Sequence, residues 1–130
     1  MKALLINKNG PKHKPIELYG SKNFDTMTDY IDLDANNFYE FTSENGFVLL
    51  CGMSNEYCCV QFSHENGEPP YEVAVSPIPL SINSEINYYI DNTATEVPNE
   101  LCISTKFAYD IIKYFLDHGE KFPAIEWQEI

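Results

Sequence analysis

The sequence predicts an α+β protein in which an antiparallel β-sheet of about five to seven strands, running largely as a meander, carries two helices packed on one face. In residues 38–76 apolar and polar side chains alternate and turn signals recur about every eight to twelve residues, which is typical of antiparallel strands. In 24–31 and 107–115 apolar residues recur instead at helical spacing, which indicates two amphipathic helices. With 130 residues, 44% of them hydrophobic, the chain is expected to form one domain over 1–130.

The N-terminal part predicts one strand and one helix. The apolar run at 2–7 suits a buried strand, and the Asn-Gly-Pro sequence at 9–11 ends it. Ser21 or Asn23 can cap the helix that follows, and Asn36-Asn37 closes it. The apolar face of this helix comprises Phe24, Met27, Tyr30 and Ile31.

The meander is expected to begin with four strands. Pro77 and Pro79 end the fourth strand, because proline has no N–H to donate to a ladder. A fifth meander strand is expected at 86–90, before a turn at Asp91-Asn92. The first four strands are placed at 38–42, 47–53, 57–63 and 71–76, joined by turns at 44–46 and 54–55 and by a longer loop at 64–70.

The second helix has clear signals at both ends. Ser104 is a suitable N-cap, and Gly119 is placed to end the helix in the left-handed conformation. Pro123 then permits only an extended tail, in which Ile125 and Trp127 point one way and Trp127 closes the core. The apolar stripe that needs a sheet to cover comprises Phe107, Ala108, Ile111, Ile112 and Phe115.

Charge is distributed unevenly along the chain. Eight lysines, no arginine and 20 acidic residues give a formal net charge of -12. Residues 23–105 hold 14 of the acids and no lysine, so the middle of the chain is purely anionic. Such a surface repels the phosphate backbone, so nucleic acid is not expected as a partner. It attracts a basic protein instead.

The residues that most often perform catalysis do not form a motif here. Cys59 and His64 flank the end of a predicted strand, but the acidic surroundings raise a thiol pKa rather than lower it. The four cysteines contain no C-x-x-C pair and are interpreted as small hydrophobic residues in a reducing compartment. The acids match no EF-hand loop, and the glycines form no phosphate-binding loop. We therefore expect no enzyme activity, no catalytic residue, no cofactor and no metal.

The apolar run at 3–6 is too short for a signal peptide or a membrane span, so a cytoplasmic location without a membrane partner is expected. A protein-binding surface is then the remaining candidate. If one face of the sheet packs on the helices through Cys58, Val60, Phe62, Tyr71, Val73 and Val75, the other presents Tyr39 or Phe38, Cys59, Gln61, Glu72, Asn87 and Tyr89. Tyrosine supplies contact area at low entropic cost, and acids steer a basic partner. The candidate partner-binding residues are Tyr39, Glu65, Glu68, Tyr71, Glu72 and Tyr89.

The C-terminal third resembles the end of the small immunity proteins encoded beside bacterial polymorphic toxins, particularly the family commonly paired with deaminase toxins. The shared pattern is a proline-containing turn, a hydrophobic strand end, a helix with a phenylalanine-x-x-x-glycine step, a proline and a terminal tryptophan. It is carried by Glu96-Val97-Pro98, Leu101-Cys102-Ile103, Ala108, Phe115, Gly119, Phe122-Pro123 and Ile125-Glu126-Trp127.

The resemblance implies a cytosolic α+β protein that binds one toxin domain and occludes it without catalysis. It transfers no site residue, because Gly119, Pro123 and Trp127 all have structural explanations. A toxin that acts on nucleic acid would present a basic active-site channel to the anionic block. The alternative is a small cytosolic enzyme or ligand-binding domain with its pocket between helix and sheet.

Overall fold

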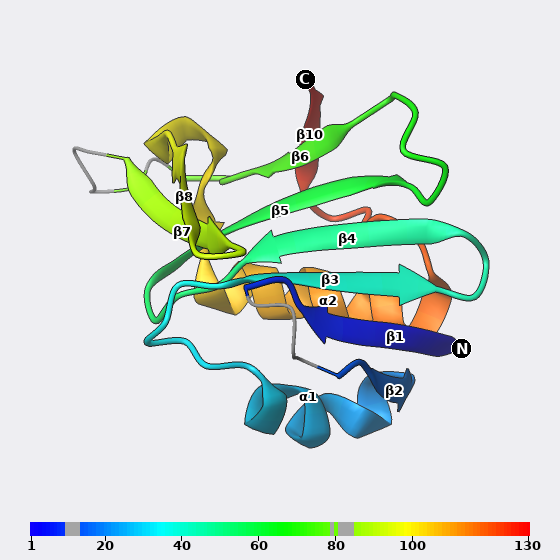
Figure 1. Cartoon of the computed structure of the whole chain (residues 1–130). Coiled ribbons are helices and arrows are strands. Elements are labelled where there is room, and N and C mark those ends of the chain that lie inside the picture. Colours follow the sequence, from blue (N-terminus) through cyan, green and yellow to red (C-terminus); the bar gives the residue numbers. More distant parts are fainter. Residues whose placement is uncertain (10–13, 79, 81–84) are drawn as a thin grey trace.

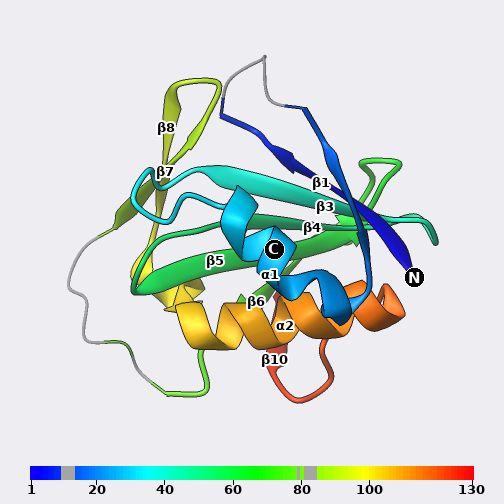
Figure 2. The ribbon, with the colours of Figure 1, turned by 90° about the horizontal axis from the view of Figure 1, so that it is seen from below.

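The structure is a computed structural model that describes residues 1–9, 14–78, 80 and 85–130. Gly10, Pro11 and Pro79, which were expected to interrupt secondary structure, lie outside the described residues. The fold is α+β, as predicted: a large antiparallel sheet is covered on one face by two helices (Figures 1 and 2).

Within the described residues the large sheet has eight strands, and the main path through it runs β10-β6-β5-β4-β3-β1-β2 (Figure 1). The short β9 pairs with β5. The expected meander is confirmed, because β3, β4, β5 and β6 pair with one another in sequence order. The edge strands β2 and β10 were not predicted as strands. The bounds are β1 Lys2–Asn7, β2 Ile16–Tyr19, β3 Phe38–Ser43, β4 Phe47–Gly52, β5 Tyr57–His64, β6 Glu72–Val75, β9 Ile103–Ser104 and β10 Glu126–Glu129.

Both predicted helices are present, α1 at Phe24–Tyr30 and α2 at Thr105–His118, and Figure 2 shows them on the same side of the sheet. Ser104 caps α2, since its side chain accepts a hydrogen bond from the backbone N–H of Phe107 at 3.3 Å. Gly119 ends α2 with φ 65° in the left-handed region, as expected. The short segments η1 (Ser21–Asn23) and η2 (Asn99–Leu101) are 3-10 turns that precede α1 and β9.

The strand expected at 86–90 is present as β7 (Ile86–Ile90), but its place in the meander is wrong. It pairs with β8 (Thr93–Val97) in a separate two-stranded hairpin. Figure 2 shows this hairpin on the face of the sheet opposite the helices. Asp91 and Asn92 form its turn with φ 48° and 62°, which suits a two-residue hairpin loop.

The hairpin is held to the sheet by backbone contacts at its turn end. Tyr89 N–H donates to the carbonyl of Asn36 at 2.9 Å, and Asp91 N–H donates to the carbonyl of Lys8 at 3.1 Å. Its base leads through η2 into α2, so the chain passes from one face of the sheet to the other there. Both faces of the central strands are therefore covered over part of their length.

Buried side chains form two clusters, one on each face of the sheet. The helix-side cluster contains Phe41, Leu49 and Phe62 from the strands and Ile111 and Phe115 from α2. The hairpin-side cluster is smaller and comprises Phe38, Cys59, Tyr88, Val97 and Cys102. The second cluster exists because the hairpin folds back over the sheet, which the strand pattern alone did not indicate.

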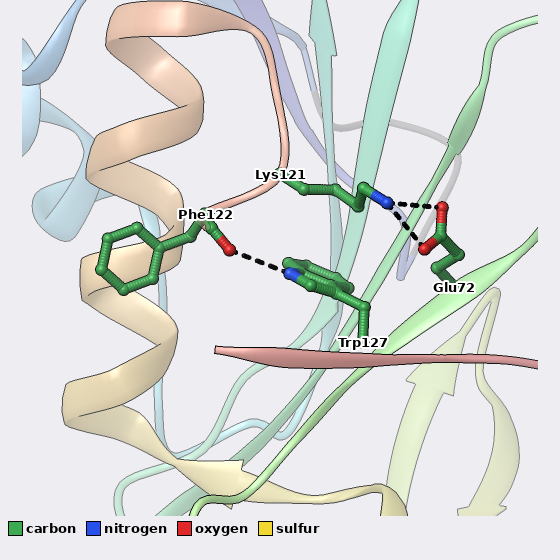
Figure 3. Close-up of polar contacts among 4 residues, drawn as sticks. All are labelled: Glu72, Lys121, Phe122 and Trp127. Atoms are coloured by element: carbon green, nitrogen blue, oxygen red, sulfur yellow. Dashed lines mark hydrogen bonds and ion pairs between the residues drawn. The ribbon is translucent and has the colours of Figure 1, made fainter. Parts of the chain in front are cut away.

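The C-terminal tail is extended, as predicted, and forms β10 on the outer edge of β6. Trp127 is half-buried against the helix-side cluster, with its ring 6.2 Å from that of Phe62. Its indole N–H donates to the carbonyl of Phe122 at 3.0 Å (Figure 3). Trp127 therefore joins the tail to the loop that follows α2.

The two faces of β6 are reversed relative to the prediction. Glu72 pairs with Phe62 and Ala74 belongs to the helix-side cluster, so both lie on the helix side. Val73 pairs with Gln61 and lies on the hairpin side. A shift of one residue exchanges the faces of a strand, and the apolar run Val73-Ala74-Val75 does not define which register is used.

Candidate partner-binding surface

Tyr39 is fully buried on the helix side, and its expected exposure is wrong. Its hydroxyl accepts a hydrogen bond from the backbone N–H of Asp32 at 2.8 Å, and its ring meets that of Tyr30 edge-on at 6.1 Å. Phe38 takes the opposite face instead and lies beneath the hairpin. Tyr39 supports the core and is not available to a partner in the folded protein.

Glu65 and Glu68 lie in the loop between β5 and β6, and both are exposed. Backbone contacts hold this loop: Glu65 N–H donates to the carbonyl of Gly46 at 2.9 Å, in the turn between β3 and β4. Tyr71 is half-buried, and its hydroxyl donates to the carbonyl of Gly67 within the same loop. The carboxylates of Glu65 and Glu68 and the side chain of Tyr71 therefore lie in one loop at one end of the sheet.

Glu72 is engaged in an internal ion pair (Figure 3). Lys121 Nζ lies 2.9 and 2.7 Å from its two carboxylate oxygens, and the side chain of Glu72 is only 20% exposed. The pair links β6 to the segment that follows α2. Glu72 is thus on the helix side rather than on the opposite face, and a partner would have to displace Lys121 to use it.

Tyr89 lies on β7, far along the sheet from the acidic loop (Figure 1). It pairs with Ala94 across the hairpin, next to the buried Tyr88, so its side chain is on the outer face of the hairpin. The predicted site residues therefore do not form one site. Glu65, Glu68 and Tyr71 share one end of the sheet, Tyr89 belongs to the hairpin, and Tyr39 is internal.

An apolar groove that was not predicted from the sequence lies between the hairpin and the sheet, and we call it the hairpin groove. Its volume is about 230 Å³. Of the described residues that line it, Gln61 and Thr95 are polar and none has a charged side chain. Its walls include Leu50, Gln61 and Val73 from the sheet, Thr95 and Val97 from β8, and Ile130 beyond β10. No local signal marks this groove, because it depends on where the hairpin docks.

Acidic residues neighbour those that line the hairpin groove. Glu40, which forms an ion pair with Lys8, pairs with the groove residue Leu50, and Glu100 precedes the groove residue Leu101 on η2. Glu96 lies between Thr95 and Val97 on β8 and faces the outer side of the hairpin. A hydrogen bond with Glu96, together with the repulsion between the two carboxylates, raises the pKa of the exposed Glu85. Glu85, Glu96 and Glu100 form no ion pair with a lysine in the part of the chain that the structure describes.

The four cysteines are free and buried, which suits the structural role expected for them. Burial raises the pKa of the Cys59 thiol well above its usual range, and burial raises that of Cys102 to about 11. Cys59 does face away from the helices, but the hairpin covers it. A thiol nucleophile needs the opposite environment, one that stabilises the thiolate.

The fold and this surface define a small acidic protein with two exposed carboxylates in one loop and an apolar groove between hairpin and sheet. A sequence model described as immunity protein Imm1 matches residues 21–129. The chain therefore belongs to the Imm1 family of immunity proteins. No curated protein matches it significantly. Among the helices of the described residues, none is long and apolar enough to cross a membrane.

Proposed function

We propose that this protein neutralises one bacterial toxin by binding its toxic domain and occluding it, without catalysis. Membership of the immunity protein family over residues 21–129 is the observation that carries this proposal. Binding rather than catalysis agrees with the environment of the thiols, whose pKa values burial raises. The protein would act in the cytoplasm, where an incoming toxin reaches its target.

The charge of the chain supports a toxin that acts on nucleic acid, such as a deaminase or a nuclease. Such an enzyme presents a basic channel to its substrate, and residues 23–105 carry 14 acids and no lysine. Long-range attraction between the two would accelerate encounter. Glu65 and Glu68 are the exposed carboxylates that we propose for this steering, with Tyr71 beside them.

Co-expression tests this proposal in cells. The toxin domain encoded beside the gene for this chain is induced in a bacterial host, alone or with the chain. We expect growth arrest by the toxin alone and full rescue by the chain. Rescue by the chain of a domain from another toxin class, or no rescue of the neighbouring one, would contradict a dedicated immunity function.

A further inference from the structure

We propose that the hairpin groove is a docking site for the toxin, and that it receives an apolar side chain presented on a basic segment of the toxin surface. This inference rests on the proposed function and adds to it the place of contact and the chemistry of the contacting segment. The hairpin groove is separate from the loop that carries Glu65 and Glu68, so the inference assigns a role to a different part of the molecule.

The shape and lining of the groove favour a protein side chain as the occupant. Its volume of about 230 Å³ is below the roughly 300–1,000 Å³ of small-molecule sites. In the part of the chain that the structure describes, Gln61 and Thr95 are the polar side chains of the lining, and no charged side chain is present to orient a polar metabolite. An aliphatic or aromatic anchor in a desolvated pocket is instead the usual centre of a protein interface.

One wall of the groove is itself accessible to a partner. Thr93, Ala94, Thr95 and Glu96 of β8 are all exposed, and in the described residues only β7 pairs with this strand. At the other side, Ile130 leaves 57% of its surface exposed. Apolar surface that stays open between two secondary-structure elements is typical of a binding groove.

Charge identifies the segment around the anchor as basic. Of the residues that line the groove, all but Ile130 belong to the block 23–105, which has no lysine. Glu85 and Glu96 hold two carboxylates in mutual contact, and a cation from a partner would relieve their repulsion. Lys or Arg residues beside the anchor would therefore meet Glu100, the neighbour of the groove residue Leu101, at the rim. Known interfaces likewise surround an apolar centre with polar groups.

Two adjacent residues of β8 provide a matched test. Thr95 pairs with the buried Tyr88 and faces the groove, whereas Ala94 pairs with Tyr89 and faces outward. Thr95→Arg and Ala94→Arg change the net charge equally on one exposed strand. Binding is measured by surface plasmon resonance with the catalytically inactivated toxin domain encoded beside this gene. We expect Thr95→Arg to raise the Kd by at least about tenfold, mainly through faster dissociation, and Ala94→Arg to have a much smaller effect.

A second pair of variants separates the contribution of apolar contact in the groove from that of overall charge. Ile130→Asp removes apolar surface from the groove, while Leu4→Asp makes the same change at an exposed position of β1 away from it. If only charge mattered, the extra acid would help binding in both variants. We expect Ile130→Asp to weaken binding and Leu4→Asp not to weaken it.

The outcomes distinguish this inference from the function on which it rests. If the unmodified chain binds the toxin domain and both groove variants bind like their controls, the groove is not the docking site, and the immunity function stands. If the unmodified chain does not bind, both fail. Circular dichroism and thermal melting of all four variants confirm that differences in binding do not arise from unfolding.

Discussion

The ring of Tyr88 lies directly on the backbone of Gly52. A Cβ atom on Gly52 would stand 2.6 Å from Tyr88 Cγ and 2.8 Å from Cys59 Sγ, so only glycine permits this contact. The Tyr88 hydroxyl donates to the carbonyl of Tyr57 at 2.8 Å, and its ring packs against Phe38 at 5.6 Å. Tyr88 thus packs the hairpin against the sheet.

Gly52→Ala should therefore destabilise the protein by displacing Tyr88. Overpacking of this kind costs about 1–3 kcal/mol. Urea denaturation measures the change in the free energy of unfolding. In a Tyr88→Ala background the added methyl group should cost less, because the clash with the ring is gone and the one with Cys59 Sγ remains. Equal costs in both backgrounds would show that the contact does not seat the hairpin.

Trp127 should contribute to stability through both its ring and its N–H. We expect Trp127→Ala to cost about 3 kcal/mol, since it leaves a space beside Phe62 and loosens β10. Trp127→Phe keeps a ring and loses the hydrogen bond to Phe122, which should cost about 1 kcal/mol. Thermal melting checks that Trp127→Ala is less stable than Trp127→Phe. An unchanged melting temperature for Trp127→Ala would show that Trp127 does not contribute to the core.

The thiols should be unreactive in the folded protein. Burial raises the pKa of Cys51, Cys58, Cys59 and Cys102, so little thiolate is present at pH 8 and the sulfur atoms are covered. Mass spectrometry after treatment with iodoacetamide should show modification only after a denaturant is added. Rapid labelling of one cysteine under native conditions would contradict its burial and revive a chemical role for it.

The acidic loop should set the association rate with the toxin. Glu65→Lys with Glu68→Lys should slow association by about tenfold at low salt, and less at 1 M salt, where the Debye length is about 3 Å. Asp25→Lys with Asp29→Lys on α1 is the matched control, because it makes the same change in charge at exposed positions elsewhere. Stopped-flow measurements compare the association rates of the two double variants at low and high salt. Identical rates for the two double variants would show that this loop does not steer the partner.

Local signals predicted much of the fold. Ser104 and Gly119 bound α2 because capping depends on a few neighbouring residues, and the meander follows from turns that are close in sequence. The position of β7 could not be predicted in this way. Its residues suit any antiparallel strand. The hairpin is placed on the far face by the packing of Tyr88 on Gly52 and by backbone hydrogen bonds to Asn36 and Lys8, all of them distant in sequence.

The candidate site was less predictable for a related reason. Phe38 and Tyr39 are adjacent aromatic residues, so the pattern could not decide which of them lies under the helices. Glu72 was assigned to the wrong face because its ion pair with Lys121, which lets an acid lie on the helix side, joins segments far apart in the chain. The exposed acids Glu65 and Glu68 were placed correctly at the surface, since a loop between strands is normally exposed.

The proposed function requires that this protein inactivates its toxin domain by direct binding. Titrating the purified chain into the active toxin domain encoded beside its gene, with turnover of the toxin substrate as readout, tests this most directly. We expect activity to fall linearly and to vanish near an equimolar ratio, with a complex that elutes as a single species in gel filtration. Full toxin activity in the presence of excess folded chain, with no complex detected, would contradict the account.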